Sequence, residues 1–202
     1  MGPPMDRAAR GLERLGVTAN AVTAVGALIG LAACAAIVLE AYRVGLALIL
    51  ANRLLDGLDG ALARRTGPTD LGGFMDLVAD FLFYSAVPFA FALAAPNRAL
   101  AAAFLIFSFV GTGVSFLAFA AIAAGRAMTT DKYGRKSLYY LGGLTEGAET
   151  ILLFVLMAVR PDWFEPLAWG FGTLCWITTA GRIWSGVVLL RGPRPPAAHP
   201  AG

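Results

Sequence analysis

Four aspartates stand within or at the ends of apolar stretches in the first half of the chain. Asp56 and Asp59 are three residues apart, so they share one face of a helix. Asp76 and Asp80 are four apart and share a face of the next helix. An aspartate at the centre of a membrane-spanning helix costs roughly 2.5–3.5 kcal/mol on the insertion scale, so four of them need a compensating partner. Carboxylate oxygens suit a hard divalent cation such as Mg²⁺, Mn²⁺ or Ca²⁺, and we expect all four aspartates to be metal ligands.

The two helices that carry the aspartates are expected to be antiparallel neighbours, because the connection between them is short. Their facing ends can then bring the four carboxylates to one point near a membrane surface. A less specific interpretation is that the aspartates form ion pairs with Arg53, Arg64 and Arg65 inside a helix bundle. The regular spacing of all four aspartates favours the metal site.

Glycines are interleaved with the aspartates, at Gly57, Gly60, Gly72 and Gly73. A glycine in a helix interior costs about 1 kcal/mol relative to alanine. Near a metal site it removes a side chain and lets a ligand approach the backbone. Arg64 lies one turn beyond Gly60, where its guanidinium could meet a phosphate.

The composition is that of a polytopic membrane protein. Of the 202 residues, 58% are hydrophobic and only 14% are charged, against about 25% charged in an average soluble domain. A helix needs about 20 apolar residues to cross a bilayer. We predict an all-α fold with a short amphipathic juxtamembrane helix at 4–16, a single membrane domain at 1–192 and a disordered Pro-rich tail at 193–202. The six predicted membrane spans are 20–40, 44–63, 73–95, 99–124, 138–159 and 166–190.

Basic residues are distributed unevenly between the two sides of the predicted bundle. Cytoplasmic loops of membrane proteins carry an excess of Lys and Arg. Only Arg43, Arg98 and Arg160 fall on one side. We therefore expect both termini and the aspartates to lie on the cytoplasmic side. The other basic residues used for this assignment are Arg7, Arg10, Arg14, Arg64, Arg65, Arg126, Lys132, Arg135, Lys136, Arg191 and Arg194.

The aspartate segment resembles the signature of the CDP-alcohol phosphatidyltransferase family, D-x2-D-G-x2-A-R followed by a spacer and G-x3-D-x3-D. The spacer, residues 65–71, is one residue shorter than is common. The stretch VTANAVT at 17–23 also resembles the opening of the family's first span, so the resemblance covers nearly the whole chain. The stretches NRLLDGLDGALARR and YYLGGLTEGAET resemble a small, poorly characterised bacterial inner-membrane branch. The signature positions are Asp56, Asp59, Gly60, Ala63, Arg64, Gly72, Asp76 and Asp80.

The resemblance implies a phospholipid-biosynthetic enzyme that moves a phosphatidyl group from CDP-diacylglycerol to an alcohol and releases CMP. It implies Mg²⁺ or Mn²⁺ as cofactor, a multi-pass protein of the bacterial inner (cytoplasmic) membrane in contact with membrane lipid, and a homodimer; no nucleic-acid partner is expected. Asp56, Asp59 and Asp76 would be metal ligands, and Asp80 would complete the metal site and act as general base. Gly60, Ala63 and Arg64 would hold the CDP moiety, with Gly72 close by.

Two sets of residues are candidates for binding the acceptor. Glu146 and Glu149 could line a pocket for a polyol or a cationic alcohol, or could instead pair with Arg126 or Arg182. Arg126, Lys132 and Arg135 could bind a phosphorylated acceptor, or could serve only as positive-inside residues.

Two other classes of function remain open at this stage. A divalent-cation transporter would also use intramembrane aspartates, but it needs acidic groups along a path across the membrane, and the outer half has no matching set. A non-catalytic membrane scaffold would not need all four aspartates.

Overall fold

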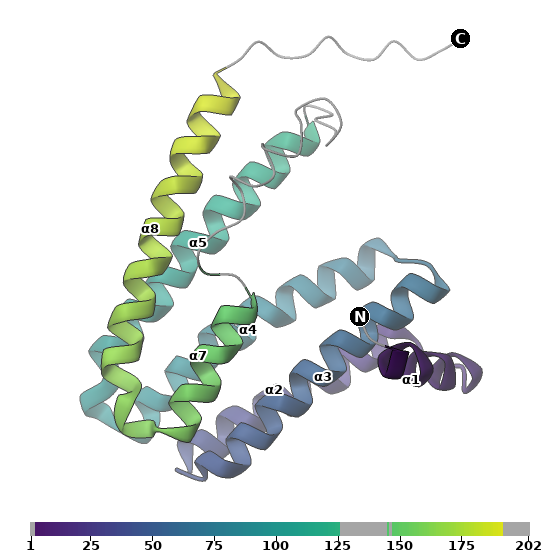
Figure 1. Ribbon diagram of the computed structural model, residues 1–202, viewed down its shortest axis with the longest axis horizontal. Helices are drawn as coiled ribbons and strands as arrows, with labels where there is room; N and C mark the ends of the chain where they lie inside the picture. The colour runs from purple at the N-terminus through teal and green to yellow at the C-terminus, as the bar shows by residue number, and fades with distance from the viewer. Residues whose placement is uncertain (1–2, 126–144, 146, 192–202) are drawn as a thin grey trace.

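The computed structural model describes residues 3–125, 145 and 147–191, and these residues form seven α-helices and two short 3₁₀ helices (Figure 1). The all-α prediction is confirmed for this part of the chain. The predicted tail at 193–202 lies outside the described residues. The α-helices are α1 (Pro3–Arg14), α2 (Ala19–Val38), α3 (Tyr42–Thr66), α4 (Asp70–Ala94), α5 (Ala99–Gly125), α7 (Gly147–Val159) and α8 (Phe164–Leu190), and the 3₁₀ helices are η1 (Pro96–Arg98) and η2 (Pro161–Trp163).

Within the described residues, four stretches are long and apolar enough to cross a membrane: Ala19–Val38, Asp70–Ala94, Pro96–Ala123 and Pro161–Leu190. Six spans are therefore not confirmed. Helix α3 has 25 residues but carries the charges of Arg53, Asp56 and Asp59 near its middle. Helix α7 has only 13 residues in the described part of the chain, and the segment before it is not described apart from Thr145.

The two turns that lead into α2 and α4 are built alike. Gly16 (φ 72°) and Gly67 (φ 97°) adopt positive φ, where a side chain would be strained. Two residues later a threonine caps the next helix: the Thr18 hydroxyl accepts from the Ala21 N–H at 3.2 Å, and the Thr69 hydroxyl accepts from the Gly72 N–H at 3.1 Å. These caps fix where α2 and α4 begin.

Helix α2 packs against both α3 and α4, and α5 packs against α8; α4 also contacts α5 and so joins the two pairs (Figure 1). Direct contacts between α3 and α4 are sparse, although a short turn connects them. The two aspartate helices therefore diverge, and α2 closes one side of the space between them.

Two apolar clusters hold these helices. The larger cluster includes the fully buried Phe91, Phe154 and Phe164. The smaller one joins α1 to the ends of α2 and α3 through the buried Ala9, Val22, Ala61 and Leu62. An N-terminal helix is thus present where the sequence predicts one, and it is packed beside the signature end of α3.

Candidate active site

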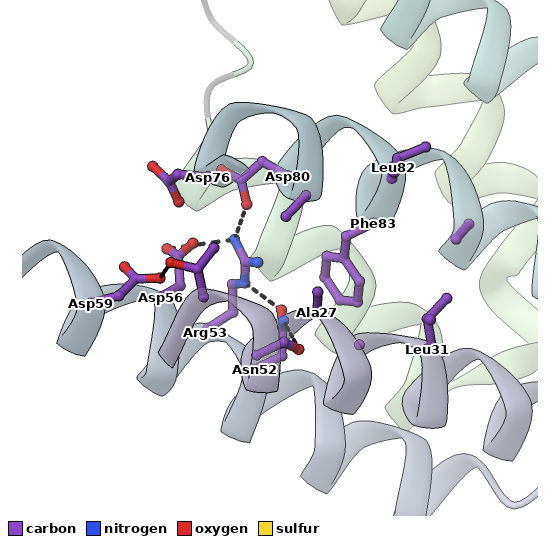
Figure 2. A pocket seen from close by; sticks show the side chains of 15 residues that line it. Ala27, Leu31, Asn52, Arg53, Asp56, Asp59, Asp76, Asp80, Leu82 and Phe83 are labelled. Carbon is purple, nitrogen blue, oxygen red and sulfur yellow. Dashed lines mark hydrogen bonds and ion pairs between the residues drawn. The ribbon is translucent and has the colours of Figure 1, made fainter. Parts of the chain in front are cut away.

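A cavity of about 230 Å³ lies between α2, α3 and α4, and all four signature aspartates line it (Figure 2). Its other walls are largely apolar. Apart from Leu31, the wall on α2 is made by small residues, which leave room beside that helix. The apolar and small residues that line it are Gly26, Ala27, Gly30, Leu31, Ala79, Leu82, Phe83 and Ala86. The cavity therefore combines an acidic end with an apolar end.

Asp59 is the most buried of the four aspartates, with 5% of its surface exposed. The hydroxyl of Thr23, from α2, donates to its Oδ2 at 2.6 Å. This bond fixes the Asp59 carboxylate from a neighbouring helix.

Asp80 and Asp56 both face Arg53, which stands one turn before Asp56 on α3. Arg53 Nη1 lies 2.9 Å from Asp80 Oδ1 and 3.7 Å from Asp56 Oδ2 (Figure 2). The Tyr84 hydroxyl lies 3.4 Å from the other Asp80 oxygen, Oδ2. Asp80 is thus held on both of its oxygens.

Asp76 lies one helical turn before Asp80 and is exposed. It lines the aspartate cavity and also a second, larger cavity of about 510 Å³ beside it. Asp59 and Thr23 are likewise shared by both cavities. The two spaces therefore meet at Asp59 and Asp76.

The second cavity brings together three of the four residues predicted to hold CDP: Gly60, Ala63 and Gly72 line it. Arg64 is not among its lining residues, and its guanidinium lies over Gly60, 3.4 Å from the position that a Cβ there would take. A Cβ on Gly72 would lie 2.9 Å from Asn20 Oδ1, so the absence of a side chain at this position lets Asn20 approach. The cavity is lined further by Glu13 and Thr69.

The aspartates fit a divalent cation in the type of their oxygens, and all four line one cavity. Within the described residues, however, no three acidic, histidine or cysteine side chains are grouped closely enough to ligate one ion. The expectation that four carboxylates meet at one point is thus met only in part. Asp56 and Asp80 face Arg53, and Asp59 faces Thr23, so these side chains would have to turn to share an ion. The ion-pair alternative is also partly right, since Arg53 pairs with two aspartates while Arg65 pairs with Asp6 and Glu13.

Most of the residues predicted to bind the acceptor alcohol lie in the part of the chain that the structure does not describe. Arg126, Lys132, Arg135 and Glu146 lie outside the described residues. Glu149 lies in the first turn of α7, is exposed, and lines neither of the two cavities.

Sequence reasoning missed several residues at this site. Thr23 and Asn20 lie in the VTANAVT segment, whose resemblance to the family marked it without assigning any contact. Tyr84 lies one turn beyond Asp80 on the same helix face, which is the signal that could have found it. Asn52 directly precedes Arg53, and no pattern in the sequence marked it as part of the site.

Comparison with known proteins agrees with the signature. The profile of the family described as CDP-alcohol phosphatidyltransferase matches residues 16–184. The chain is 55% identical to inner membrane protein YnjF of Escherichia coli over 94% of this chain and 92% of that protein. It is 37% identical to archaetidylinositol phosphate synthase of Pyrococcus horikoshii over 45% of this chain and 48% of that protein.

Solved structures of Mycobacterium tuberculosis phosphatidylinositol phosphate synthase share the fold. The structure with CDP-DAG bound has a TM-score of 0.59 and 23% identity, covering 98% of each chain. The structure in complex with manganese and citrate has a TM-score of 0.67 and 20% identity, covering 98% of this chain and 93% of that one. With every signature residue except Arg64 lining two adjoining cavities and the family profile spanning most of its length, this chain belongs to the CDP-alcohol phosphatidyltransferase family of membrane-bound, phospholipid-biosynthetic enzymes.

Proposed function

We propose that this enzyme moves a phosphatidyl group from CDP-diacylglycerol to an alcohol acceptor, with release of CMP. The observation that carries the proposal is the meeting, at Asp59 and Asp76, of two cavities that differ in their lining. Leu31, Leu82 and Phe83 line the first one away from the aspartates, whereas the second is lined by glycines and by polar side chains such as those of Thr18, Asn20 and Thr69. CDP-diacylglycerol has a polar nucleotide and an apolar lipid joined by a pyrophosphate. A site for it needs two such compartments with the reacting phosphorus at their junction.

The nucleotide would occupy the larger cavity, where Gly60, Ala63 and Gly72 leave its walls open. Arg64, which lies over Gly60, would approach a phosphate from the side. The start of the lipid moiety would lie against the small and apolar residues of the aspartate cavity, between α2 and α4. The acyl chains would continue into the bilayer.

The carboxylates at the junction would repel the anionic pyrophosphate unless a cation stands between them. Asp56, Asp59, Asp76 and Asp80 would hold Mg²⁺ or Mn²⁺, both of which accept all-oxygen ligation. A bound divalent cation supplies Lewis-acid stabilisation of the charge that grows on the leaving phosphate. The solved relative in complex with manganese supports this choice of ion.

Asp80 is the residue that we assign as general base. Its carboxylate takes the proton of the acceptor hydroxyl as that oxygen forms a bond to the phosphatidyl phosphorus. The bond from this phosphorus to the bridging oxygen of CMP breaks, and CMP leaves. The contacts of Arg53 and Tyr84 on the two Asp80 oxygens support a role that needs a fixed direction.

The acceptor is best sought by a panel of alcohols. The name of the archaeal relatives, archaetidylinositol phosphate synthase, places inositol phosphate first in that panel. Glu146, Glu149, Arg126, Lys132 and Arg135 stay as candidate acceptor residues.

We place the enzyme in the bacterial inner membrane as a multi-pass homodimer, with both termini and the active site cytoplasmic. The name of the Escherichia coli relative supports the membrane. The basic residues near α1 and the signature support the orientation.

The test is CMP release by the purified full chain in liposomes with CDP-diacylglycerol, Mg²⁺ or Mn²⁺, and one alcohol at a time. The panel holds inositol phosphate, glycerol phosphate, inositol, serine, glycerol and phosphatidylglycerol. Metal-dependent release with one acceptor supports the proposal and names the substrate. No release with any of these alcohols, together with no binding of CDP-diacylglycerol, contradicts the proposal. In that case, cation flux into the same liposomes would favour a divalent-cation transporter, and the absence of flux would favour a non-catalytic scaffold.

A further inference from the structure

Arg53 is a cation built into the acidic end of the aspartate cavity. The side chain is only 16% exposed. The cavity holds four carboxylates and this one guanidinium, a formal charge of −3. Arg53 lies outside the family signature that marks the aspartates. We assign it to the site because it contacts Asp80 and Asp56.

Two contacts hold the Arg53 side chain independently of the aspartates, and one of the two partners is itself anchored to α2. Its Nε donates to Asn52 Oδ1 at 2.8 Å (Figure 2). Asn52, which is 4% exposed, in turn donates from Nδ2 to the backbone carbonyl of Gly26 on α2 at 2.8 Å. The guanidinium also lies over the Phe83 ring, 5.0 Å from its centroid. A continuous series of hydrogen bonds therefore connects the α2 backbone, through Asn52 and Arg53, to Asp80 on α4.

The oxygens that Arg53 contacts are ones that a divalent cation would use. Arg53 Nη1 donates to Asp80 Oδ1 at 2.9 Å and lies 3.7 Å from Asp56 Oδ2. A carboxylate oxygen held by a guanidinium at this distance is less available to a metal ion, and two positive charges at such separations repel each other. Because Asn52 and Phe83 hold Arg53 in place, the guanidinium remains near the ion when the carboxylates turn toward it.

We propose that Arg53 is a positioning residue that competes with the divalent cation for Asp80 and fixes the direction of its carboxylate. The inference rests on the proposed function, in which Asp80 is both metal ligand and general base. Arg53 weakens the binding of the ion, and in exchange it keeps one Asp80 oxygen turned from the ion toward the acceptor. Its removal therefore has two opposite effects, tighter metal binding and slower turnover.

The experiment compares Arg53→Gln with Arg98→Gln in the purified full chain. Arg98 is a matched control: it is also half-buried, it donates to Tyr42 Oη at 3.2 Å, and it lies 5.9 Å from the ring centroids of Phe91 and Phe164. It lies in η1, beyond the C-terminal end of α4, and lines neither cavity. Mn²⁺ binding is measured by the paramagnetic resonance signal of the free ion. CMP release is measured with CDP-diacylglycerol at saturating Mn²⁺.

In Arg53→Gln the dissociation constant for Mn²⁺ should fall about 5–50-fold, because a like charge at contact distance is gone. Turnover should fall at least about 30-fold, while KM for CDP-diacylglycerol stays within about 3-fold. Arg98→Gln should change neither quantity beyond about 2-fold. Unchanged or weaker Mn²⁺ binding in Arg53→Gln overturns the proposal. An equal increase in Mn²⁺ affinity in Arg98→Gln also overturns it, as does a wild-type chain that binds no Mn²⁺.

Arg53→Lys keeps the positive charge but lacks the planar fork that reaches Asn52 and Asp80 together. Its Mn²⁺ affinity should stay within about 3-fold of the wild type, while its turnover falls about 10-fold. This variant carries the test if Arg53→Gln does not fold, and full turnover in it overturns the positioning role. A wild-type chain that binds Mn²⁺ but releases no CMP removes the transferase proposal, and tighter binding in Arg53→Gln then still supports the competition.

Discussion

Thr23 of α2 donates a hydrogen bond of 2.6 Å to Asp59 of α3, at the point where the two cavities meet. The bond links the helix that opens the membrane domain to the second aspartate of the signature. Asp59 is nearly fully buried, so its carboxylate depends on such partners for solvation.

Replacing Thr23 by valine should lower the free energy of unfolding by about 1–3 kcal/mol, because it removes a donor from a buried acceptor. Turnover should also fall, since Asp59 would no longer be held in one direction. Thr23→Ser should restore most of both. Thr173→Val is the matched control, because the Thr173 hydroxyl donates to a backbone carbonyl on an exposed part of α8. Thermal unfolding in detergent checks the prediction, and equal losses in the two valine variants would contradict it.

Gly72→Ala should damage the nucleotide cavity, which Gly72 lines, whereas Gly181→Ala on α8 should not, because Gly181 lines neither cavity. A Cβ at Gly72 would lie 2.9 Å from Asn20 Oδ1 and 3.1 Å from Thr69 Oγ1, while a Cβ at Gly181 meets no atom within 4 Å. The new methyl group and the displaced Asn20 side chain would take up space proposed for CDP, and KM for CDP-diacylglycerol should rise about 10-fold. Kinetics of CMP release with both variants test this, and the idea fails if Gly181→Ala has the larger effect.

Helix α1 is predicted to support the nucleotide cavity, because Glu13 near its end lines that space. Ala9 is fully buried against Ala61 and Leu62, whereas its neighbour Ala8 is exposed. Ala9→Phe overpacks this contact, which costs about 1–3 kcal/mol and displaces α1 from α3. KM for CDP-diacylglycerol should rise in Ala9→Phe and stay unchanged in Ala8→Phe. A nucleotide affinity that is the same in both variants would show that α1 has no part in the site.

Removal of divalent cations should abolish CMP release, by at least about 100-fold, because the carboxylates would then repel the pyrophosphate. Treatment with EDTA followed by Mg²⁺ or Mn²⁺ should restore the rate. EDTA already saturated with Mg²⁺ is the control for direct effects of the chelator. A rate that survives exhaustive chelation would remove the metal from the mechanism.

The sequence predicted the helical class and the common cavity of the aspartates from a few physical facts. Carboxylates at i, i+3 and i, i+4 must share a helix face, and a short turn must keep the adjoining ends of two helices near each other. The lining of the second cavity by Gly60, Ala63 and Gly72 agrees with their shared signature.

The contacts within the site could not be predicted in the same way. Whether Arg53 turns toward Asp80 or toward solvent depends on Asn52, and Asn52 is positioned by the Gly26 carbonyl on another helix. The carboxylates do not meet at one point because α3 and α4 diverge from their turn, and sequence spacing carries no information on that angle.

The number of spans could not be fixed from hydropathy for a related reason. Helix α3 is long enough to cross a bilayer but carries the charges that make the site. The charged residues that the site needs therefore lower the hydropathy of this helix below that of an ordinary membrane span. The predicted span at 138–159 is described only from residue 147, apart from Thr145.

The most direct test of the central claim is the rate of CMP release in Asp80→Asn compared with Asp70→Asn. Both changes remove one carboxylate from α4, but Asp70 is exposed in the first turn and lines neither cavity. With Asp80 as general base, Asp80→Asn should lose about 10²–10⁴-fold in rate while still binding CDP-diacylglycerol, and Asp70→Asn should keep its rate. Turnover in Asp80→Asn within a few-fold of the wild type would contradict the account.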